Sequence, residues 1–321
     1  MRNKKIIITG GAGFIGSNVA GVLNRLGRKD LIIVDHLRED KKPNLEIFEY
    51  ERYLDKDEFI DKIKTGSIPE AEVVIHLGAR TDTTETDRGF IIKNNTEYSQ
   101  TLFTYCARKG IRFIYASSAS VYGDGLKGYD EEEWDLKPLN YYAESKFLFD
   151  KWVIKQQNVP PQWIGLRFFN VYGPNEYHKG KMASVIYHSF NQINLDGAAK
   201  LFKSNKPDYK DGEQKRDFIY VKDTAKVINF FLDSPDKNGI YNLGTGRART
   251  FYDLAKATFS ALGREPNIDF VNMPENLKDK YQYFTQAEMA KLRGAGYTQP
   301  FYELEDGIYD YVQNYLINRK T

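Results

Sequence analysis

The segment from Lys5 to Asp35 constrains the fold more than any other part of this 321-residue chain. Lys5–Thr9 is a short β-branched run that ends at glycines, which predicts a buried strand. From Phe14 to Leu26 the apolar residues recur at helical spacing, and 31–34 is a second apolar run. A strand, a crossover helix and a second strand predict two parallel neighbours in one sheet.

The alternation of apolar runs and helical patterns continues to about residue 170. Further buried strands are predicted for 72–76, 111–116 and 163–168. Helices are predicted between them for 57–65, 89–109 and 141–156. We therefore expect an α/β fold with a doubly wound, Rossmann-type parallel sheet that helices cover on both faces.

Glycines at regular spacing follow the first predicted strand. Gly10, Gly13 and Gly16 fit the pattern G-x-x-G-x-x-G, directly before and inside the predicted helix. Glycines allow a tight turn and let bare backbone approach a pyrophosphate, while the helix directs its N–H groups toward it. Asp35 ends the second strand, where an acid accepts a hydrogen bond from a ribose hydroxyl. The combination predicts a bound dinucleotide.

The residues after Asp35 leave the choice of dinucleotide open. An acid at this position favours NAD, because it binds the free ribose hydroxyls. His36, Arg38, Lys41 and Lys42 follow closely, and cations there would bind the 2′-phosphate of NADP. A basic loop in solvent explains the same residues equally well.

The regular alternation breaks down after about residue 170. We expect 1–170 to form the dinucleotide-binding domain, and 214–247, with short apolar runs at 218–221 and 240–243, to return to it. Residues 171–213 and 248–321 are expected to form a smaller substrate-binding lobe. Helices are predicted there for 183–195, 250–262 and 285–292.

A serine, a tyrosine and a lysine indicate alcohol chemistry. Tyr142 and Lys146 are four residues apart, which places them on one face of the predicted helix. A cation beside a phenol lowers its pKa, so that the tyrosinate takes a proton from an alcohol as hydride leaves the same carbon. Ser118 follows the strand at 111–116, at the sheet edge where doubly wound folds bind ligands. Its hydroxyl would hold the substrate oxygen, or it would simply cap the strand end.

Composition excludes several other classes of protein. Lys and Arg exceed Asp and Glu by 46 − 44 = 2, which gives no electrostatic case for nucleic-acid binding. A single cysteine, Cys106, rules out a disulfide or a cysteine-based metal site within one chain, and we expect no metal. No segment approaches the roughly 18 to 20 apolar residues of a membrane span. The protein is expected to be cytoplasmic.

Several longer stretches resemble one family. Residues 9–16, 117–123 and 142–146 together are similar to the extended short-chain dehydrogenase/reductases. Within that family, the stretch at 178–180 and residues 281–287 of the stretch at 277–287 resemble the ADP-L-glycero-D-manno-heptose 6-epimerases. The resemblance runs from residue 4 to about 317.

The resemblance implies an epimerase that uses bound NADP without net redox change. Such an enzyme inverts C6″ of ADP-D-glycero-D-manno-heptose through a transient ketone, for the lipopolysaccharide inner core. Tyr142 would remove the hydroxyl proton, and inversion calls for a second acid/base, a role the resemblance gives to Lys179. The sequence alone leaves His178 and Lys181 as rivals, and a solvated basic loop as the alternative. A homo-oligomer is implied, specifically a pentamer.

The resemblance also implies two sets of contacts. Those to the cofactor are Phe14, Ile15, Asp35, His36, Lys42, Lys56, Leu77, Gly78, Ala79, Arg80, Thr81, Asn94, Lys146 and Lys179, besides the glycine turn. Those to the substrate are Asn170, Val171, Lys181, His188, Phe202, Lys203, Ser204, Asn205, Arg216 and Tyr281. The guanidinium of Arg216 suits a pyrophosphate, although a surface salt bridge with Asp217 or Glu213 is the alternative.

Two rival functions remain. One is another nucleotide-sugar 4-epimerase or a dehydratase; dehydratases of this superfamily place an Asp-Glu pair after the serine, where this chain has Ala119 and Ser120. The other is a non-catalytic NADP-binding sensor, which would usually lack the Tyr-Lys pair that is present here.

Overall fold

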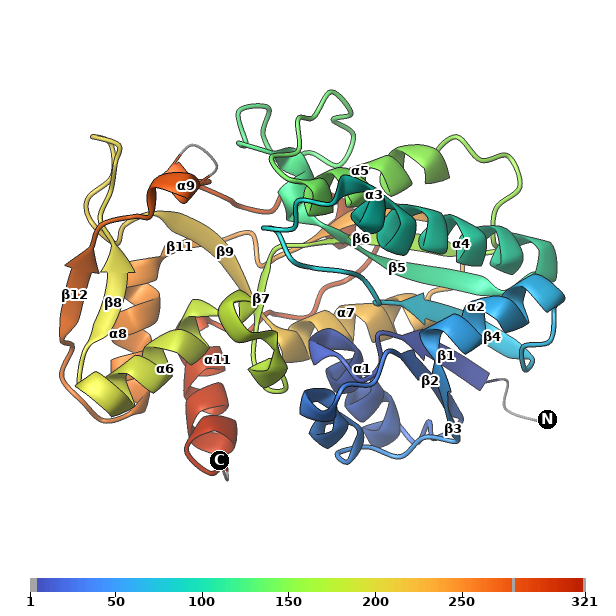
Figure 1. Cartoon of the computed structure of the whole chain (residues 1–321), viewed down its shortest axis with the longest axis horizontal. Coiled ribbons are helices and arrows are strands. Elements are labelled where there is room, and N and C mark those ends of the chain that lie inside the picture. Colours follow the sequence, from blue (N-terminus) through green and yellow to red (C-terminus); the bar gives the residue numbers. More distant parts are fainter. Residues whose placement is uncertain (1–4, 279–280, 320–321) are drawn as a thin grey trace.

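The central sheet carries most of the predicted strands. Within residues 5–278 and 281–319, which the computed structural model describes, seven parallel strands lie in the order β10-β6-β5-β4-β1-β2-β3 (Figure 1). Their bounds are β1 (Lys5–Thr9), β2 (Leu31–Asp35), β3 (Arg52–Asp55), β4 (Ala71–His76), β5 (Arg112–Ser118), β6 (Trp163–Phe168) and β10 (Gly239–Leu243). The expected α/β fold with a doubly wound Rossmann-type sheet is confirmed.

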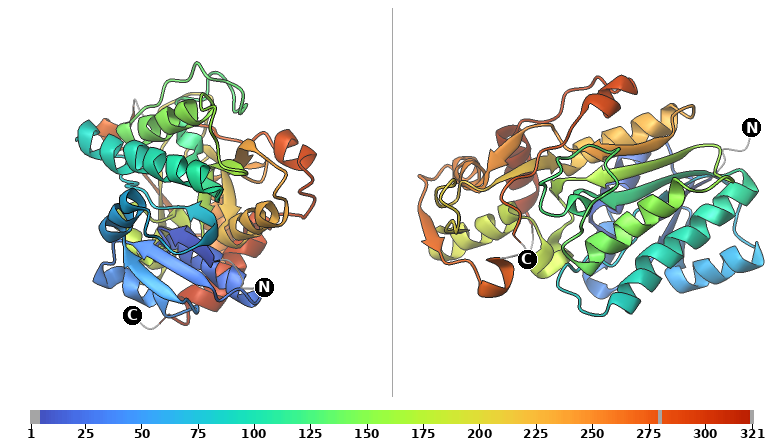
Figure 2. Two further views of the ribbon diagram at one scale, coloured as in Figure 1. Left: turned by 90° about the vertical axis from the view of Figure 1, so that its right-hand side faces the viewer. Right: turned by 90° about the horizontal axis from the view of Figure 1, so that it is seen from above.

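Helices cover both faces of this sheet, as the alternating strand side chains require. On β1, Ile6 and Ile8 point to one face, where α1 (Phe14–Arg25) and α7 (Val221–Asp233) pack. Ile7 points to the other face, among residues of α2 (Lys56–Thr65), α4 (Tyr98–Lys109) and α5 (Tyr141–Val153). Each face is therefore a continuous apolar layer, and the edge-on views of Figure 2 show the helices on either side of the strands.

The glycine turn after β1 is formed by close backbone approach. Gly10 has φ +71°, and a Cβ on it would lie 2.6 Å from the backbone nitrogen of Gly78. A Cβ on Gly16 would collide with the carbonyl oxygen of Gly10. Side chains at these positions would therefore separate the ends of β1 and β4, or α1 from the turn.

A smaller lobe lies beside the carboxyl ends of the strands (Figure 1). It contains a parallel pair, β8 (Ala199–Phe202) and β12 (Ile268–Val271), with α6 (Val185–Asp196), α8 (Phe251–Ala261) and α11 (Leu304–Tyr311). A further sheet of β11 (Ala248–Thr250), β9 (Lys215–Tyr220) and β7 (Asn170–Tyr172) connects it to the main domain. The remaining helices are α3 (Arg88–Ile92), α9 (Glu275–Lys278) and α10 (Ala290–Gly294), and a π-helical turn at Lys93–Glu97 joins α3 to α4.

Two expectations for the second half are wrong. The run at 218–221 does not return to the central sheet: β9 pairs with β7 and β11, and only β10 joins β6. The helix predicted for 285–292 begins only at Ala290, because the preceding residues run alongside β9. There Thr285 N–H donates to the Lys215 carbonyl at 3.2 Å, and Ala287 N–H donates to the Asp217 carboxylate at 3.0 Å.

Two smaller points complete the comparison. The short strand β3 has no counterpart in the prediction, because four residues are too few for a periodic signal. Residues 279 and 280, part of the stretch at 277–287, lie outside the described residues. In the part of the chain that the structure describes, no helix is both long enough and apolar enough to cross a membrane.

Candidate active site

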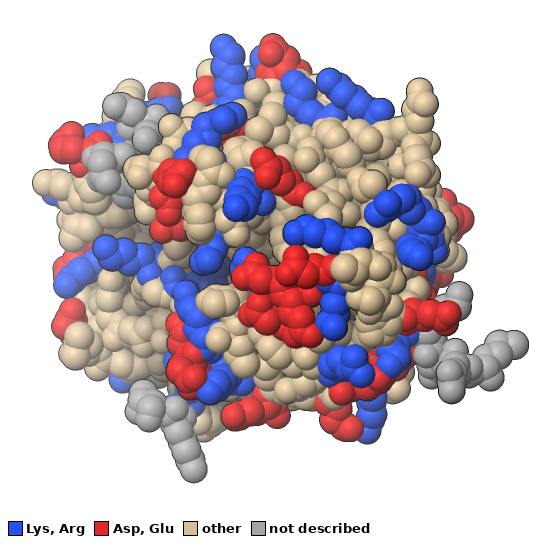
Figure 3. Space-filling view, turned by 45° about the vertical axis from the view of Figure 1, so that its right-hand side comes forward, with Lys and Arg blue, Asp and Glu red and all other residues tan. Residues whose placement is uncertain are grey.

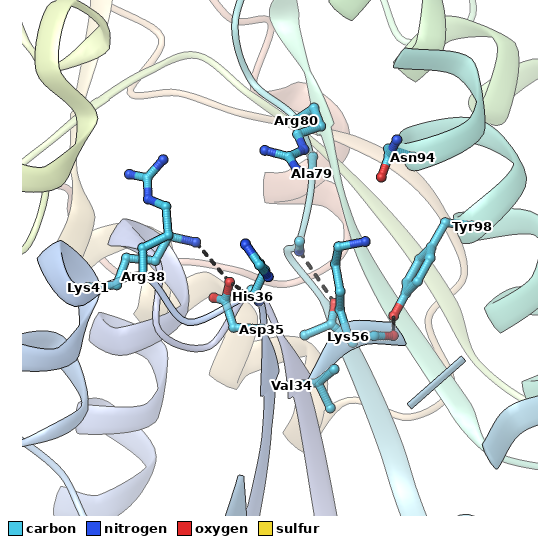
Figure 4. A pocket seen from close by; sticks show the side chains of 13 residues that line it. Val34, Asp35, His36, Arg38, Lys41, Lys56, Ala79, Arg80, Asn94 and Tyr98 are labelled. Atoms are coloured by element: carbon cyan, nitrogen blue, oxygen red, sulfur yellow. Dashed lines mark hydrogen bonds and ion pairs between the residues drawn. The ribbon is translucent and has the colours of Figure 1, made fainter. Parts of the chain in front are cut away.

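A pocket lies where β1, β2 and β4 end, at the glycine turn (Figure 4). Thr9 and Gly10 end β1, and the backbone N–H of Gly78 donates to the Thr9 hydroxyl at 3.4 Å. The lining residues are Thr9, Gly10, Val34, Asp35, His36, Arg38, Lys41, Lys56, Gly78, Ala79, Arg80, Asn94 and Tyr98. About half of the predicted cofactor contacts thus meet in one place. In Figure 3 Lys and Arg side chains border a hollow in the surface, next to a cluster of Asp and Glu.

Asp35 is the acid at the end of β2, and its carboxylate is already fully engaged. Oδ2 accepts the backbone N–H of Ala12 at 3.0 Å, and Oδ1 accepts that of His36 at 2.7 Å. The Lys41 ammonium lies 2.8 Å from Oδ1, as the dashed line in Figure 4 shows. The side chain is only 6% exposed, so Lys41 neutralises it within the pocket wall.

The basic residues after Asp35 divide between the pocket and the surface. His36, Arg38 and Lys41 line the pocket, together with Lys56 and Arg80 from other segments. Lys42 lies outside the lining and pairs with Glu39 at 2.7 Å on the surface. Lys42, a predicted cofactor contact, is therefore paired with Glu39 and does not line this pocket.

A second cavity extends from the first toward the smaller lobe. Ala79 lines both cavities, and Lys146 lines the second. Of the residues predicted for the site, it is lined by Phe14, Ile15, Leu77, Ala79, Thr81, Ser118, Tyr142, Lys146, Asn170, Val171, Lys179, Arg216 and Tyr281. Residues predicted from one end of the chain to the other therefore converge on one cavity.

The serine, tyrosine and lysine of the predicted constellation all line this cavity. Asn140 caps α5 by accepting the Ala143 N–H at 2.9 Å, which sets Tyr142 in the first turn and Lys146 one turn later. The Lys146 ammonium donates to the carbonyl oxygen of Ala116 at 2.8 Å. Ser118 also caps a 3₁₀ turn, because its hydroxyl oxygen accepts the Ser120 N–H at 3.2 Å. The capping role of Ser118 is thus confirmed, and its contact with the substrate oxygen stays a prediction.

Burial sets the protonation of these groups. It raises the pKa of Tyr142, although hydrogen bonding from Ser118 opposes the rise. The lowering of that pKa expected from Lys146 is not seen here, because desolvation dominates and the opposing contribution comes from Ser118. Burial also lowers the pKa of Lys146 to about 8, against the opposing charge of Asp150. At neutral pH the site holds a phenol beside an ammonium ion.

The basic stretch after β7 contains three candidates for the second acid/base, and one of them lies in the cavity. Lys179 lines it, with Nζ 5.2 Å from the centre of the Phe14 ring. Burial lowers the pKa of Lys179, while Glu176 opposes this change. His178 instead faces the other way, with Nδ1 3.4 Å from Nδ2 of Asn44. Lys181 is exposed and outside the lining.

Arg216 is the buried cation at the far end of the cavity. It is 7% exposed and lies between two aromatic rings, 5.1 Å from the centre of Tyr281 and 5.7 Å from that of Phe251. No carboxylate among the described residues pairs with it, and Asp217 instead accepts the N–H groups of Thr245 and Gly246. The alternative of a surface salt bridge therefore does not hold.

Some predicted substrate contacts lie outside the cavity, and some lining residues were not predicted. Outside it are Lys181, His188, Phe202, Lys203, Ser204 and Asn205. Among the unpredicted ones are Thr83, Met182, Ser184 and Phe251. They reach the cavity through the tertiary fold: the Thr83 hydroxyl lies 3.9 Å from the Met182 sulfur, although 99 residues separate them.

Comparison with known proteins places the chain in a family. Residues 6–244 match the family described as "NAD dependent epimerase/dehydratase family". A curated relative from Fusobacterium nucleatum subsp. nucleatum, named ADP-L-glycero-D-manno-heptose-6-epimerase, is 50% identical over 97% of this chain and 98% of its own. One of the same name from Nitratidesulfovibrio vulgaris is 48% identical, covering 97% of each chain.

Solved structures agree on the fold. The Helicobacter pylori ADP-L-glycero-D-manno-heptose-6-epimerase has a TM-score of 0.82 at 28% identity, over 97% of this chain and 96% of that one. The Thermus thermophilus UDP-glucose 4-epimerase, solved with NAD, has a TM-score of 0.79 at 24% identity, over 98% and 100%. At that identity the second likeness shows the fold alone.

Proposed function

The chain belongs to the NAD dependent epimerase/dehydratase family, and within it we propose that it is an ADP-L-glycero-D-manno-heptose 6-epimerase. The observation that carries this is the 50% identity over nearly the full length to a relative of that name. The substrate would be ADP-D-glycero-D-manno-heptose, a precursor for the lipopolysaccharide inner core, and the product its C6″ epimer.

The residues at the first pocket fit a nicotinamide dinucleotide. α1 begins at Phe14, and its N-cap residue Gly13 offers no side-chain cap, so the first N–H groups of the helix suit a pyrophosphate. We propose NADP rather than NAD, because Lys41 neutralises Asp35 and Arg38 and Arg80 also line the pocket. Neutralisation removes the repulsion that a lone carboxylate would exert on a 2′-phosphate. Denaturing the purified protein and identifying the released nucleotide tests this, and release of NAD alone would contradict it.

Epimerisation at a carbinol carbon needs proton transfer on two faces of the ketone. The bound nicotinamide would supply the chemistry that oxidises C6″ and then reduces it from the opposite face. Tyr142 exchanges a proton with the sugar oxygen, and the Ser118 hydroxyl holds that oxygen in place. The Lys146 ammonium, fixed by Ala116, contributes the positive charge that favours tyrosinate when the proton leaves.

Lys179 is our second acid/base. Its support is that it lines the cavity, unlike His178 and Lys181. Burial favours the free amine of Lys179 and the phenol of Tyr142, because both shifts disfavour the charged forms. The two side chains therefore offer two positions for proton transfer, which is what inversion through a ketone requires.

Arg216 is proposed to hold the pyrophosphate of the nucleotide sugar. A buried guanidinium without a carboxylate partner has a large gain from binding an anion, and its planar fork matches two phosphate oxygens. Tyr281 and Phe251 hold that guanidinium between their rings. A homo-oligomer, specifically a pentamer, and a cytoplasmic location stay predictions. Light scattering of the purified protein measures the oligomeric state.

The test is direct conversion. The purified protein is incubated with ADP-D-glycero-D-manno-heptose, and the C6″ epimers are separated by chromatography. The proposal expects both epimers to approach one equilibrium ratio from either side. Parallel incubations with UDP-glucose and UDP-galactose test the 4-epimerase alternative. Turnover of those sugars alone would contradict the proposal, and turnover of none would favour the non-catalytic sensor.

A further inference from the structure

A buried carboxylate lies under the turn that carries Lys179. Glu176 is fully buried, and its Oε2 accepts the backbone N–H of Ser184 at 2.6 Å. Its Oε1 accepts the Ser184 hydroxyl at 2.6 Å and, more weakly, the Gly173 N–H at 3.4 Å. These bonds tie the end of β7 to the first turn of α6, so Glu176 closes the segment between them as a loop.

Lys179 is attached to this loop through the same residue. Its backbone N–H donates to the carbonyl oxygen of Glu176 at 3.0 Å, which starts the 3₁₀ turn at Tyr177–Met182. Ser184, at the end of the loop, lines the same cavity as Lys179. Glu176 therefore holds both ends of the segment that presents the Lys179 amine.

No Lys or Arg among the described residues lies within 4.0 Å of the Glu176 carboxylate, although a buried charge normally has such a partner. The charge of Lys179 acts on Glu176, and the charge of Glu176 acts on Lys179 in turn. Burial raises the pKa of Glu176 and lowers that of Lys179, and each charge opposes the shift of the other. The titratable groups around the pair are Tyr177, Tyr187 and Tyr311 on the Glu176 side, His178 beside Lys179, and Tyr142, Lys146, Arg216 and Tyr281 along the cavity.

We propose that Glu176 is the positioning residue and charge partner of Lys179: it fixes the turn that presents the amine and supplies the buried negative charge that accompanies its ammonium form. This rests on the proposed role of Lys179 as an acid/base. With Glu176 ionised, Lys179 is able to receive a proton inside the cavity without leaving an isolated buried cation. Without that charge the amine would bind a proton only at lower pH.

The test measures the protonation of Lys179 without turnover. The purified holoenzyme is treated with a small amine-reactive reagent across a range of pH, and mass spectrometry follows labelling at Lys179. Exposed Lys181, two residues away, is the internal reference. Glu176→Gln should shift the Lys179 labelling profile to lower pH by about one unit or more, because a nearby opposite charge is worth about that much. An unchanged profile in a folded variant would overturn the proposal.

Ser184→Ala is the matched control, since it removes a hydrogen bond to Glu176 without changing the charge. If Glu176 were only a structural anchor, Glu176→Gln and Ser184→Ala would shift the Lys179 labelling profile alike. The proposal instead expects Ser184→Ala to leave the midpoint of that profile in place. If Glu176→Gln does not fold, the reciprocal measurement decides. In Lys179→Met, the infrared band of the protonated Glu176 carboxyl should persist to higher pH than in the wild type. A band that disappears at the same pH in both would contradict the pairing, whatever the enzyme's substrate.

Discussion

The Lys41 ammonium lies 2.8 Å from Oδ1 of Asp35, so the acid at the end of β2 faces the cofactor pocket as half of an ion pair. The carboxylate keeps its backbone donors, Ala12 and His36, and loses its net charge. An acid at this position favours NAD when it is considered alone. Paired with Lys41 it repels a 2′-phosphate less, and our proposal of NADP rests on this neutralisation.

Lys41→Ala should therefore change the choice of cofactor. Removing the cation exposes the 2′-phosphate to an unpaired carboxylate and deletes a charge-assisted contact worth about 1.5–3 kcal/mol. The dissociation constant of NADP should rise by about 10- to 150-fold, and that of NAD far less. Titration of nucleotide-free protein with each cofactor measures both. Lys42→Ala is the control, and an equal loss in that variant would show a nonspecific charge effect.

Tyr142→Phe should abolish most turnover and leave the fold intact. The change removes one hydroxyl and keeps the ring, so only proton transfer is lost. The expected fall in kcat is about 10²- to 10⁴-fold. Tyr141→Phe, at the exposed neighbouring position, serves as control. Activity close to wild type in the Tyr142 variant would remove that residue from the mechanism.

Lys179→Met separates catalysis from binding. If Lys179 is an acid/base, kcat falls while the nucleotide sugar still binds; if it only contacts phosphate, KM rises and kcat stays. An oxidised substrate analogue that needs one proton transfer sharpens the test. Lys179→Met and Tyr142→Phe should each spare the half-reaction at a different face. Loss of the same half-reaction in both would move the search to His178 or Lys181.

Asp150→Ala should destabilise the protein strongly. Asp150 is fully buried and accepts hydrogen bonds from Arg167 at 3.1 Å, Ser117 at 2.8 Å and Tyr115 at 3.0 Å. Removing it leaves a buried guanidinium without its charge partner, which costs about 3–5 kcal/mol. Urea unfolding measures this loss. Asp61→Ala, which breaks an exposed pair with Lys64, should cost at most about 1 kcal/mol.

Lys146 predicts a pH dependence of stability in nucleotide-free protein. Its folded-state pKa of about 8 lies below the ordinary value of 10.5. Between these values the unfolded chain binds more protons than the folded one, so the contribution of Lys146 to the free energy of unfolding rises with pH. The difference between wild type and Lys146→Met should therefore grow from pH 8 to pH 10.5. A difference that stays flat would contradict the low pKa.

Local patterns account for most of the central sheet and for the meeting of Ser118, Tyr142 and Lys146 in one cavity. Buried parallel strands are continuous apolar runs, and helical spacing alone puts Tyr142 and Lys146 on one face. Long-range pairing is different. β9 has the composition of a buried strand, and its pairing with β7 and β11 depends on residues more than 30 positions away. The segment at 285–289 has helical spacing, but its backbone N–H groups donate to Asp217 and Lys215 of β9 instead of forming helical hydrogen bonds.

Single-residue choices within loops were the least predictable part of the site. Lys41 and Lys42 have the same chemistry, and the 3₁₀ turn at Glu39–Leu45 decides which of them faces Asp35. The same holds for His178, Lys179 and Lys181, whose directions follow from a turn that Glu176 anchors. No spacing rule describes such turns, because their geometry depends on buried partners elsewhere in the chain.

The central claim is inversion of C6″ through a ketone, with the hydrogen kept on the enzyme between the two steps. Conversion of ADP-D-glycero-D-manno-heptose in D₂O, followed by NMR at C6″, tests it most directly. The account predicts the L epimer with its original protium at C6″, because that hydrogen never exchanges with solvent. Deuterium at C6″ of the product would show inversion by deprotonation at carbon, and would contradict the account.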